Sequence, residues 1–126
     1  MLLTYQELER IAKTEFSEII KGTRFIGGRS VQPNKLRVYF IDDSFLDVWL
    51  SDEGDYSYHW EQRACRGLIH RWDNAPDHPE IESFPHHFHD GEETNVVSSS
   101  MDMSIKGAFR EVLEFISNKL KEYHID

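Results

Sequence analysis

The chain has 126 residues and a mass of 14.9 kDa, which is enough for one domain and too short for two of ordinary size. Hydrophobic residues make up 39% of it, so a packed core is expected rather than a disordered chain. Its formal net charge of −9 disfavours nucleic-acid binding by the surface as a whole, although it leaves room for a local basic site.

The single cysteine, Cys65, cannot form an internal disulfide, which fits a reducing compartment. The N-terminal segment lacks the basic and then apolar regions of a signal peptide. No apolar run approaches the roughly 20 residues that span a bilayer. We therefore expect a cytoplasmic protein that has no membrane partner.

The first predicted element is a helix over residues 4–21. Thr4 and Glu7 have the spacing of a capping box, in which each side chain satisfies a backbone N–H at the start of a helix. Gly22 is the expected stop. The helical spacing is carried by Leu8, Ile11, Ala12, Phe16, Ile19 and Ile20.

From residue 23 the apolar period changes to two, which predicts strands. A first strand contains Gly27 and Gly28 as a bulge or bend, and short turns connect the strands that follow. Short connections predict antiparallel pairing in a meander. The later strands are expected over residues 35–42, 45–51, 56–62 and 67–74.

Residues 74–85 contain three of the four prolines and predict a loop across the end of the sheet, followed by a short strand at 86–90. A last amphipathic helix is expected over 104–123, with Asp102 or a nearby serine as its cap. The order predicts one α+β domain over residues 1–126. Its antiparallel meander sheet has five to six strands, with the N- and C-terminal helices packed on one face.

Histidine is the unusual feature of the composition, because six of the seven histidines fall within residues 59–89. Imidazole can give and take a proton near neutral pH and is also the commonest metal ligand. A two-residue turn at Ala64-Cys65 would place His59 opposite His70 on adjacent strands. A register shifted by one residue would instead place His59 opposite Arg71 and separate the two histidines.

This region contains four motifs: YSYHW at 56–60, RWDNAP at 71–76, HPE at 78–80 and FPHHFH at 84–89. Together they resemble the TumE family, a group of small prokaryotic proteins encoded in toxin–antitoxin modules and assigned the toxin role. The resemblance covers about residues 56–100, and the flanking helices agree with it in type and place. It implies a cognate antitoxin, usually a helix-turn-helix DNA-binding protein. Asp77 stands where the family has a second histidine, and Phe88 stands where a lysine is common.

The leading hypothesis is a toxin that acts on RNA as a metal-independent ribonuclease with no cofactor. Such an enzyme needs a general base, a general acid and a cation for the phosphate. The expected catalytic residues are His59, His70, Arg71, Asp73, His86 and His87. The expected substrate-binding residues are Tyr58, Trp60, Arg66, Trp72 and Asn74, with the aromatic rings stacking on bases.

Two alternatives remain open. His87 and His89 at i and i+2 of a strand face the same way, which suits a transition metal, with a third ligand from His59, His70, His78 or Asp73. The other alternative is a non-catalytic binding module that docks a protein partner or effector. A structural role is also ordinary for several of these residues, with the tryptophans in the core and His78 solvated in a loop.

Overall fold

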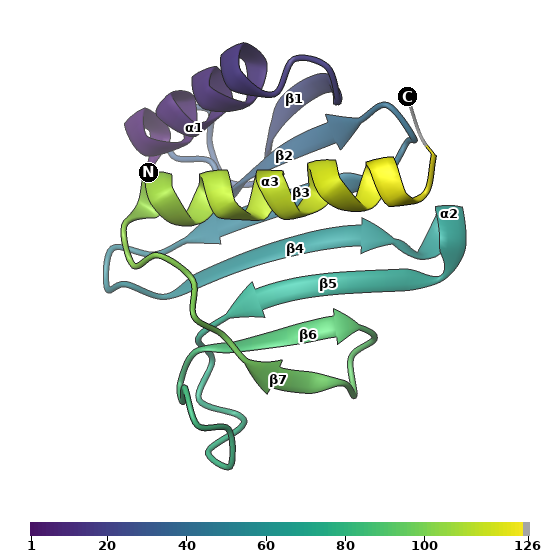
Figure 1. The fold of residues 1–126 in the computed structure, drawn as a ribbon. Helices are drawn as coiled ribbons and strands as arrows, with labels where there is room; N and C mark the ends of the chain where they lie inside the picture. The colour runs from purple at the N-terminus through teal and green to yellow at the C-terminus, as the bar shows by residue number, and fades with distance from the viewer. Residues whose placement is uncertain (125–126) are drawn as a thin grey trace.

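The structure, a computed structural model, describes residues 1–124. Its seven-stranded sheet is an antiparallel meander in which each strand pairs with the next along the chain (Figure 1). The strands are β1 (Ile20–Ile26), β2 (Lys35–Phe40), β3 (Phe45–Leu50), β4 (Tyr56–Gln62), β5 (Leu68–Asp73), β6 (His87–Gly91) and β7 (Val96–Ser98). The predicted meander is confirmed. The strand that the sequence did not predict is β7, whose three residues are too few to show an alternating pattern.

The helices α1 (Leu2–Glu15) and α3 (Ile105–Glu122) cover one face of the sheet, as predicted (Figure 1). Glu15 of α1 and Arg110 of α3 form a surface ion pair at 2.8 Å between the two helices. Within residues 1–124, none of the helices has the length and apolar character needed to cross a membrane. The fully buried core side chains include Tyr5, Leu8, Leu36, Phe40, Leu46, Tyr58, Trp60, Phe109, Leu113, Ile116 and Leu120.

The first helix differs from its prediction at both ends. It begins at Leu2, so Thr4 lies inside the first turn, and no side chain caps the N-terminus. The predicted capping box is therefore wrong. The helix ends at Glu15, and Ile20 already pairs with Phe40 in the sheet. The apolar residues Ile19 and Ile20 fit either the buried face of a helix or a strand, and here the pairing of Ile20 with Phe40 of β2 places Ile20 in the sheet.

Gly27 and Gly28 lie beyond the end of β1 rather than inside it, which corrects the predicted bulge. Both adopt positive φ, at 69° and 65°, in the turn toward β2. A Cβ on Gly28 would stand 2.5 Å from the carbonyl oxygen of Gln32. The turn therefore requires glycine there, both for its left-handed conformation and for the close approach of the backbone.

The last helix matches its prediction closely. Ser104 is the N-cap, and its hydroxyl accepts a hydrogen bond from the backbone N–H of Gly107 at 3.1 Å. The Asp102 carboxylate in turn accepts hydrogen bonds from the backbone N–H and the hydroxyl of Ser104. Phe115 projects from α3 onto the β4–β6 part of the sheet and makes edge contacts with Trp60 and Trp72.

Strands β4 and β5 are adjacent and antiparallel, as predicted, but the turn between them is longer than two residues. The one-turn helix α2 (Arg63–Arg66) joins them, and Gly67 closes the turn in the left-handed conformation at φ 74°. Trp60 is therefore opposite His70, and His59 is opposite Arg71. The expected pairing of His59 with His70 is wrong, because the two side chains point to opposite faces of the sheet.

Candidate functional site

The face of the sheet away from the helices carries a row of polar side chains across β4, β5 and β6. In the observed register His59 is opposite Arg71, which is opposite His89 on the next strand. Asp73 is likewise opposite His87. Alternation along each strand places all five side chains on one face, since residues two apart point the same way. The uncovered face thus holds four of the six predicted catalytic residues: His59, Arg71, Asp73 and His87.

Arg71 is the centre of this row. Its Nε donates to the Asp73 carboxylate at 2.9 Å, and its two terminal nitrogens donate to the two Glu93 oxygens at 2.7 Å each. It also contacts His59 Nδ1 at 3.4 Å and His89 Nε2 at 3.2 Å. The hydrogen bonds from Arg71 lower the pKa of Glu93 to about 2. A bidentate guanidinium–carboxylate pair has the geometry with which arginine also binds a phosphate.

His59 is held in one orientation by its two neighbours. A guanidinium can only donate, so the Nδ1 of His59 accepts from Arg71 and its Nε2 carries the proton. That Nε2 donates to the Glu61 carboxylate at 3.0 Å. The His59 side chain keeps a fifth of its surface exposed. An imidazole that is oriented by a carboxylate and still reaches solvent has the arrangement of a general acid–base group.

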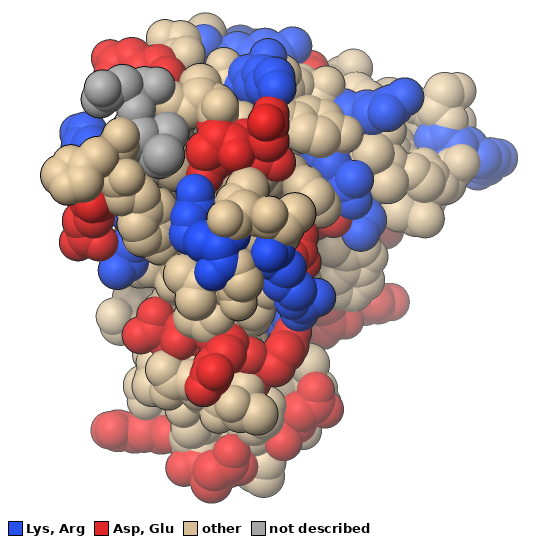
Figure 2. All heavy atoms as spheres, turned by 90° about the vertical axis from the view of Figure 1, so that its right-hand side faces the viewer, with Lys and Arg blue, Asp and Glu red and all other residues tan. Residues whose placement is uncertain are grey.

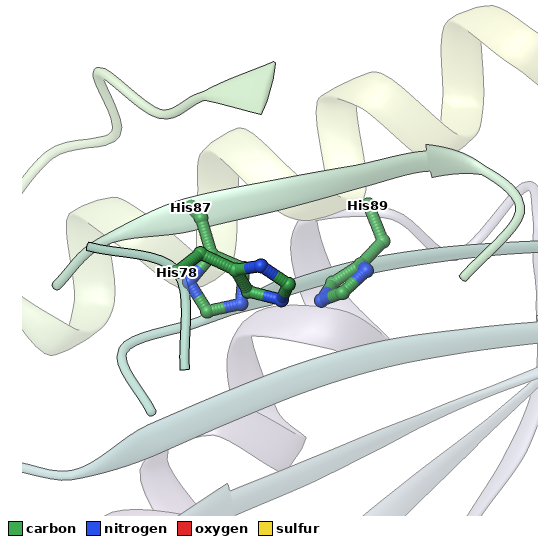
Figure 3. Close-up of side chains that lie close together, drawn as sticks. All are labelled: His78, His87 and His89. Atoms are coloured by element: carbon green, nitrogen blue, oxygen red, sulfur yellow. The ribbon is translucent and has the colours of Figure 1, made fainter. Parts of the chain in front are cut away.

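A second group of imidazoles lies beside Arg71. His78, from the loop after β5, packs edge-on against His87 and His89, with ring centres 4.8 and 5.7 Å away (Figure 3). His87 and His89 are almost completely buried, and His78 is partly buried. One nitrogen from each ring lies within 4.8 Å of the other two. His78 is therefore not the solvated loop residue expected from the sequence.

His70 lies on the opposite, helix-covered face and is 3% exposed. Its ring stacks between Trp60 and Phe88, with ring centres at 5.4 and 6.0 Å. The amide of Gln62 donates to its Nδ1 at 2.7 Å, while the Gln62 oxygen accepts from Arg66. Burial lowers the pKa of His70 to about 4, so its ring is neutral near pH 7. The structure does not bring His70 together with the other predicted catalytic residues.

The three aromatic residues predicted to bind bases also lie under the helices. Trp60 and Tyr58 are at most 2% exposed, and Trp72 is 8% exposed. The indole N–H of Trp60 donates to the Ser44 hydroxyl at 2.9 Å, which satisfies that buried donor. In this conformation the three rings form core and offer no face on which a base can stack.

His86 occupies a third location, near the start of α3. Its Nδ1 lies 2.9 Å from the Tyr56 hydroxyl, and the two rings stack. Burial raises the pKa of Tyr56 to about 12. The pair lines a cavity of about 140 Å³ together with Met101 and Ala108. His86 is thus separated from the Arg71 row by the sheet.

The two remaining predicted binding residues have partners within the fold. Arg66 binds the Asp42 carboxylate and the Gln62 oxygen, and lies over the Tyr123 ring. Asn74 ties the ends of two turns together, because it accepts from the backbone N–H of Tyr56 and donates to the Gly54 carbonyl, each at 3.0 Å. Both hydrogen bonds of Asn74 hold turns of the backbone in place, which is the ordinary role of an asparagine in a turn.

The sequence interpretation missed two residues of the site, Glu61 and Glu93, and it named His78 only as one of four alternatives for a third metal ligand. Glu93 belongs to an acidic pair in a segment for which no element was predicted, and only the β6–β7 hairpin brings it onto Arg71. Glu61 could have been found, because it is two residues from His59 on a predicted strand. Acidic residues gather over the lower end of the molecule, where β6, β7 and the loop before β6 lie, while basic residues lie over its middle and upper parts (Figure 1 and Figure 2).

Together these features define a small α+β protein with a helix-covered core and an arginine–histidine–carboxylate site on its uncovered sheet face. The family model described as toxin TumE matches residues 8–120, which is most of the chain, so the chain belongs to the TumE toxin family. Membership implies the toxin role of a toxin–antitoxin pair and hence a cognate antitoxin. Searches of curated proteins and of solved structures found no match.

Proposed function

We propose that this toxin acts on RNA at the Arg71 row, by cleaving a phosphodiester bond. The observation that carries the proposal is the contact between the Arg71 guanidinium and His59, a carboxylate-oriented imidazole that reaches solvent. When Arg71 turns to bind the phosphate, it would release His59 Nδ1, which would accept the proton of the attacking 2′-hydroxyl. The protonated His59 would then give that proton to the 5′-oxygen that leaves, so that a 2′,3′-cyclic phosphate and a free 5′-hydroxyl form. Asp73 holds Arg71 in place through its Nε.

The Glu93 carboxylate now occupies the Arg71 nitrogens that a phosphate would use. Substrate binding therefore exchanges one anion for another on the same guanidinium. Glu93 lies on a hairpin and its side chain is half exposed, so it can turn away into solvent. We therefore expect the phosphate of the substrate to bind Arg71 on the face of the sheet away from the helices, without any part of the substrate entering the core.

The charge of the protein restricts the kind of RNA. With a net charge of −9, the surface repels long polyanions, so binding depends on few phosphate contacts. We propose a short single-stranded segment as the target and the cytoplasm as the place of action. The same acidic surface is complementary to a basic partner, which supports a helix-turn-helix DNA-binding protein as the antitoxin.

A growth assay in cells that lack the antitoxin tests this proposal. The wild-type protein should inhibit growth, and His59→Gln should relieve the inhibition, since loss of a general acid–base group lowers rates by about 10²–10⁴-fold. His124→Gln, at an exposed position just after α3, is the matched control and should stay toxic. Purified proteins incubated with RNA should show the same order of cleavage on a denaturing gel.

The second candidate function is a binding module that docks a protein target without catalysis. It is favoured by the engagement of Arg71 with two carboxylates, which is also the arrangement of a structural ion-pair network. A folded His59→Gln variant that remains toxic, with RNA left intact by the wild-type protein, would contradict the RNA proposal and support this module.

A further inference from the structure

The cluster of His78, His87 and His89 is not used by the proposed RNA chemistry. The three rings come from two segments, the loop after β5 and strand β6, and they turn toward one another (Figure 3). One nitrogen of each ring lies within 4.8 Å of the others, with two of the rings almost completely buried. Three imidazoles at this spacing need a specific reason to converge.

The hydrogen bonds of the cluster place a proton on the same atom, Nδ1, of each ring. His87 Nδ1 lies 3.0 Å from the carbonyl oxygen of Pro85, and His89 Nδ1 lies 2.9 Å from the carbonyl oxygen of Glu93. A carbonyl oxygen only accepts, so each Nδ1 carries the proton. His78 Nδ1 lies 3.2 Å from a carboxylate oxygen of Glu80, with the same consequence. Nε2 is therefore the atom of each ring that can bind a metal, the usual arrangement of a metal-binding histidine. The Nε2 of His89 contacts Arg71 at 3.2 Å, so a bound metal would replace that contact.

The Nε2 atoms of His87 and His89 both face the Asp73 carboxylate. The Nε2 of His87 lies 3.0 Å from one oxygen of Asp73, and the Nε2 of His89 lies 3.7 Å from the other. Arg71 supplies positive charge on one side, since it donates to Asp73 Oδ2 at 2.9 Å and contacts His89 Nε2 at 3.2 Å. The Asp73 oxygen that faces His87 is the other one, Oδ1, which Arg71 does not bind, so a cation beside His87 Nε2 would interact with both atoms.

We propose that His78, His87 and His89 bind one divalent transition-metal ion, zinc in the first place, through their Nε2 atoms, with the Asp73 carboxylate beside it. Imidazole suits zinc and its neighbours in the transition series, whereas magnesium and calcium require oxygen ligands. Zinc–nitrogen bonds of about 2.0–2.1 Å need the three nitrogens closer together than 4.8 Å. The loop position of His78 allows that movement. Three histidines leave a fourth coordination position for water, as in catalytic zinc sites.

Titration of the full-length, tag-free protein with Zn²⁺, after treatment with a chelator, tests the proposal. Calorimetry in the presence of a competing chelator should show one equivalent bound, and Co²⁺ should give the visible absorption of a tetrahedral site. Mg²⁺ should give no heat of binding. The result does not depend on RNA being the substrate, since neither growth nor cleavage is measured.

The variants locate the site. His78→Ala, in a partly exposed loop position, should abolish stoichiometric binding while the protein keeps its fold. Glu80→Gln should weaken zinc binding about 10-fold or more, because loss of an orienting partner of a ligand has that effect. His86→Ala removes a neighbouring imidazole outside the cluster and should leave the affinity unchanged. The proposal is overturned if the folded wild type binds no zinc, or if His78→Ala binds it as tightly as the wild type.

Discussion

The buried position of His70 makes a quantitative prediction about acid stability. Burial lowers the pKa of His70 to about 4 in the folded protein, whereas a free histidine has a pKa of about 6.5. Below pH 6.5 the unfolded chain therefore binds a proton at this site that the folded protein does not bind. The stabilising contribution of neutral His70 is complete above pH 6.5 and is lost as the pH falls from 6.5 to 4.

The size of the effect follows from the same two values. One pKa unit corresponds to about 1.4 kcal/mol, so the difference between 6.5 and 4 limits the total loss to about 3 kcal/mol. At pH 5 the loss relative to pH 7 should be about 2 kcal/mol. Because the side chain is 3% exposed, solvent screening reduces this value little. The Asp90 carboxylate lies 3.5 Å from His70 Nε2, and its negative charge raises the pKa of His70, which opposes the effect of burial.

Urea denaturation of the wild type and of His70→Phe at pH 7 and pH 5 measures this contribution. Phenylalanine preserves the stack between Trp60 and Phe88 but cannot titrate. The wild type should lose about 2 kcal/mol more than His70→Phe between the two pH values, because the pH effects of all other titratable groups cancel in the comparison. Phe115→Leu loosens the same stack without removing a titratable group, and its pH dependence should match that of the wild type. Equal losses in the wild type and in His70→Phe would refute the assignment of His70 as a neutral core residue.

Two further substitutions test contacts on opposite sides of the sheet. Glu93→Gln should free Arg71 and raise its affinity for inorganic phosphate, as measured by calorimetry. Because the Glu93 carboxylate is half exposed, this substitution should lower the free energy of unfolding by no more than about 1 kcal/mol. Tyr5→Phe should lower the free energy of unfolding by about 1–3 kcal/mol in urea denaturation, because the buried Tyr5 hydroxyl donates to the Asn34 carbonyl and accepts from the Leu50 N–H. Unchanged phosphate binding in the first variant, or unchanged stability in the second, would contradict these roles.

Most of the fold could be predicted from the sequence because its signals are local. Alternation in β2, β3 and β4 and the capped apolar stripe of α3 are properties of single segments, and the structure confirms each of them. The end of α1 could not be predicted in the same way. Ile19 and Ile20 fit a helical face as well as a strand, and only the pairing of Ile20 with Phe40 distinguishes the two.

The candidate site depends on the register between β4 and β5, and the sequence allows two registers that differ by one residue. A two-residue turn and the observed α2 turn differ only in whether residues 63, 66 and 67 pair or belong to the connection. Arginine is compatible with a strand, so Arg63 and Arg66 do not exclude pairing with each other, and Gly67 is compatible with both turns. The left-handed conformation of Gly67 decides the register in favour of the longer turn.

That one-residue difference determines what the uncovered face contains. In the observed register Arg71 lies between His59 and His89, so a guanidinium, carboxylates and imidazoles share one surface. In the register expected from a two-residue turn, His59 and His70 would share a face with Trp72, and Arg71 would move away from His59. His70 and Trp72 instead form core under α3, where their chemistry is not accessible. The turn at α2 therefore both completes the core and assembles the polar site. A change of loop length there, such as deletion of Ala64, should lower the stability of the core and the function of the Arg71 row together.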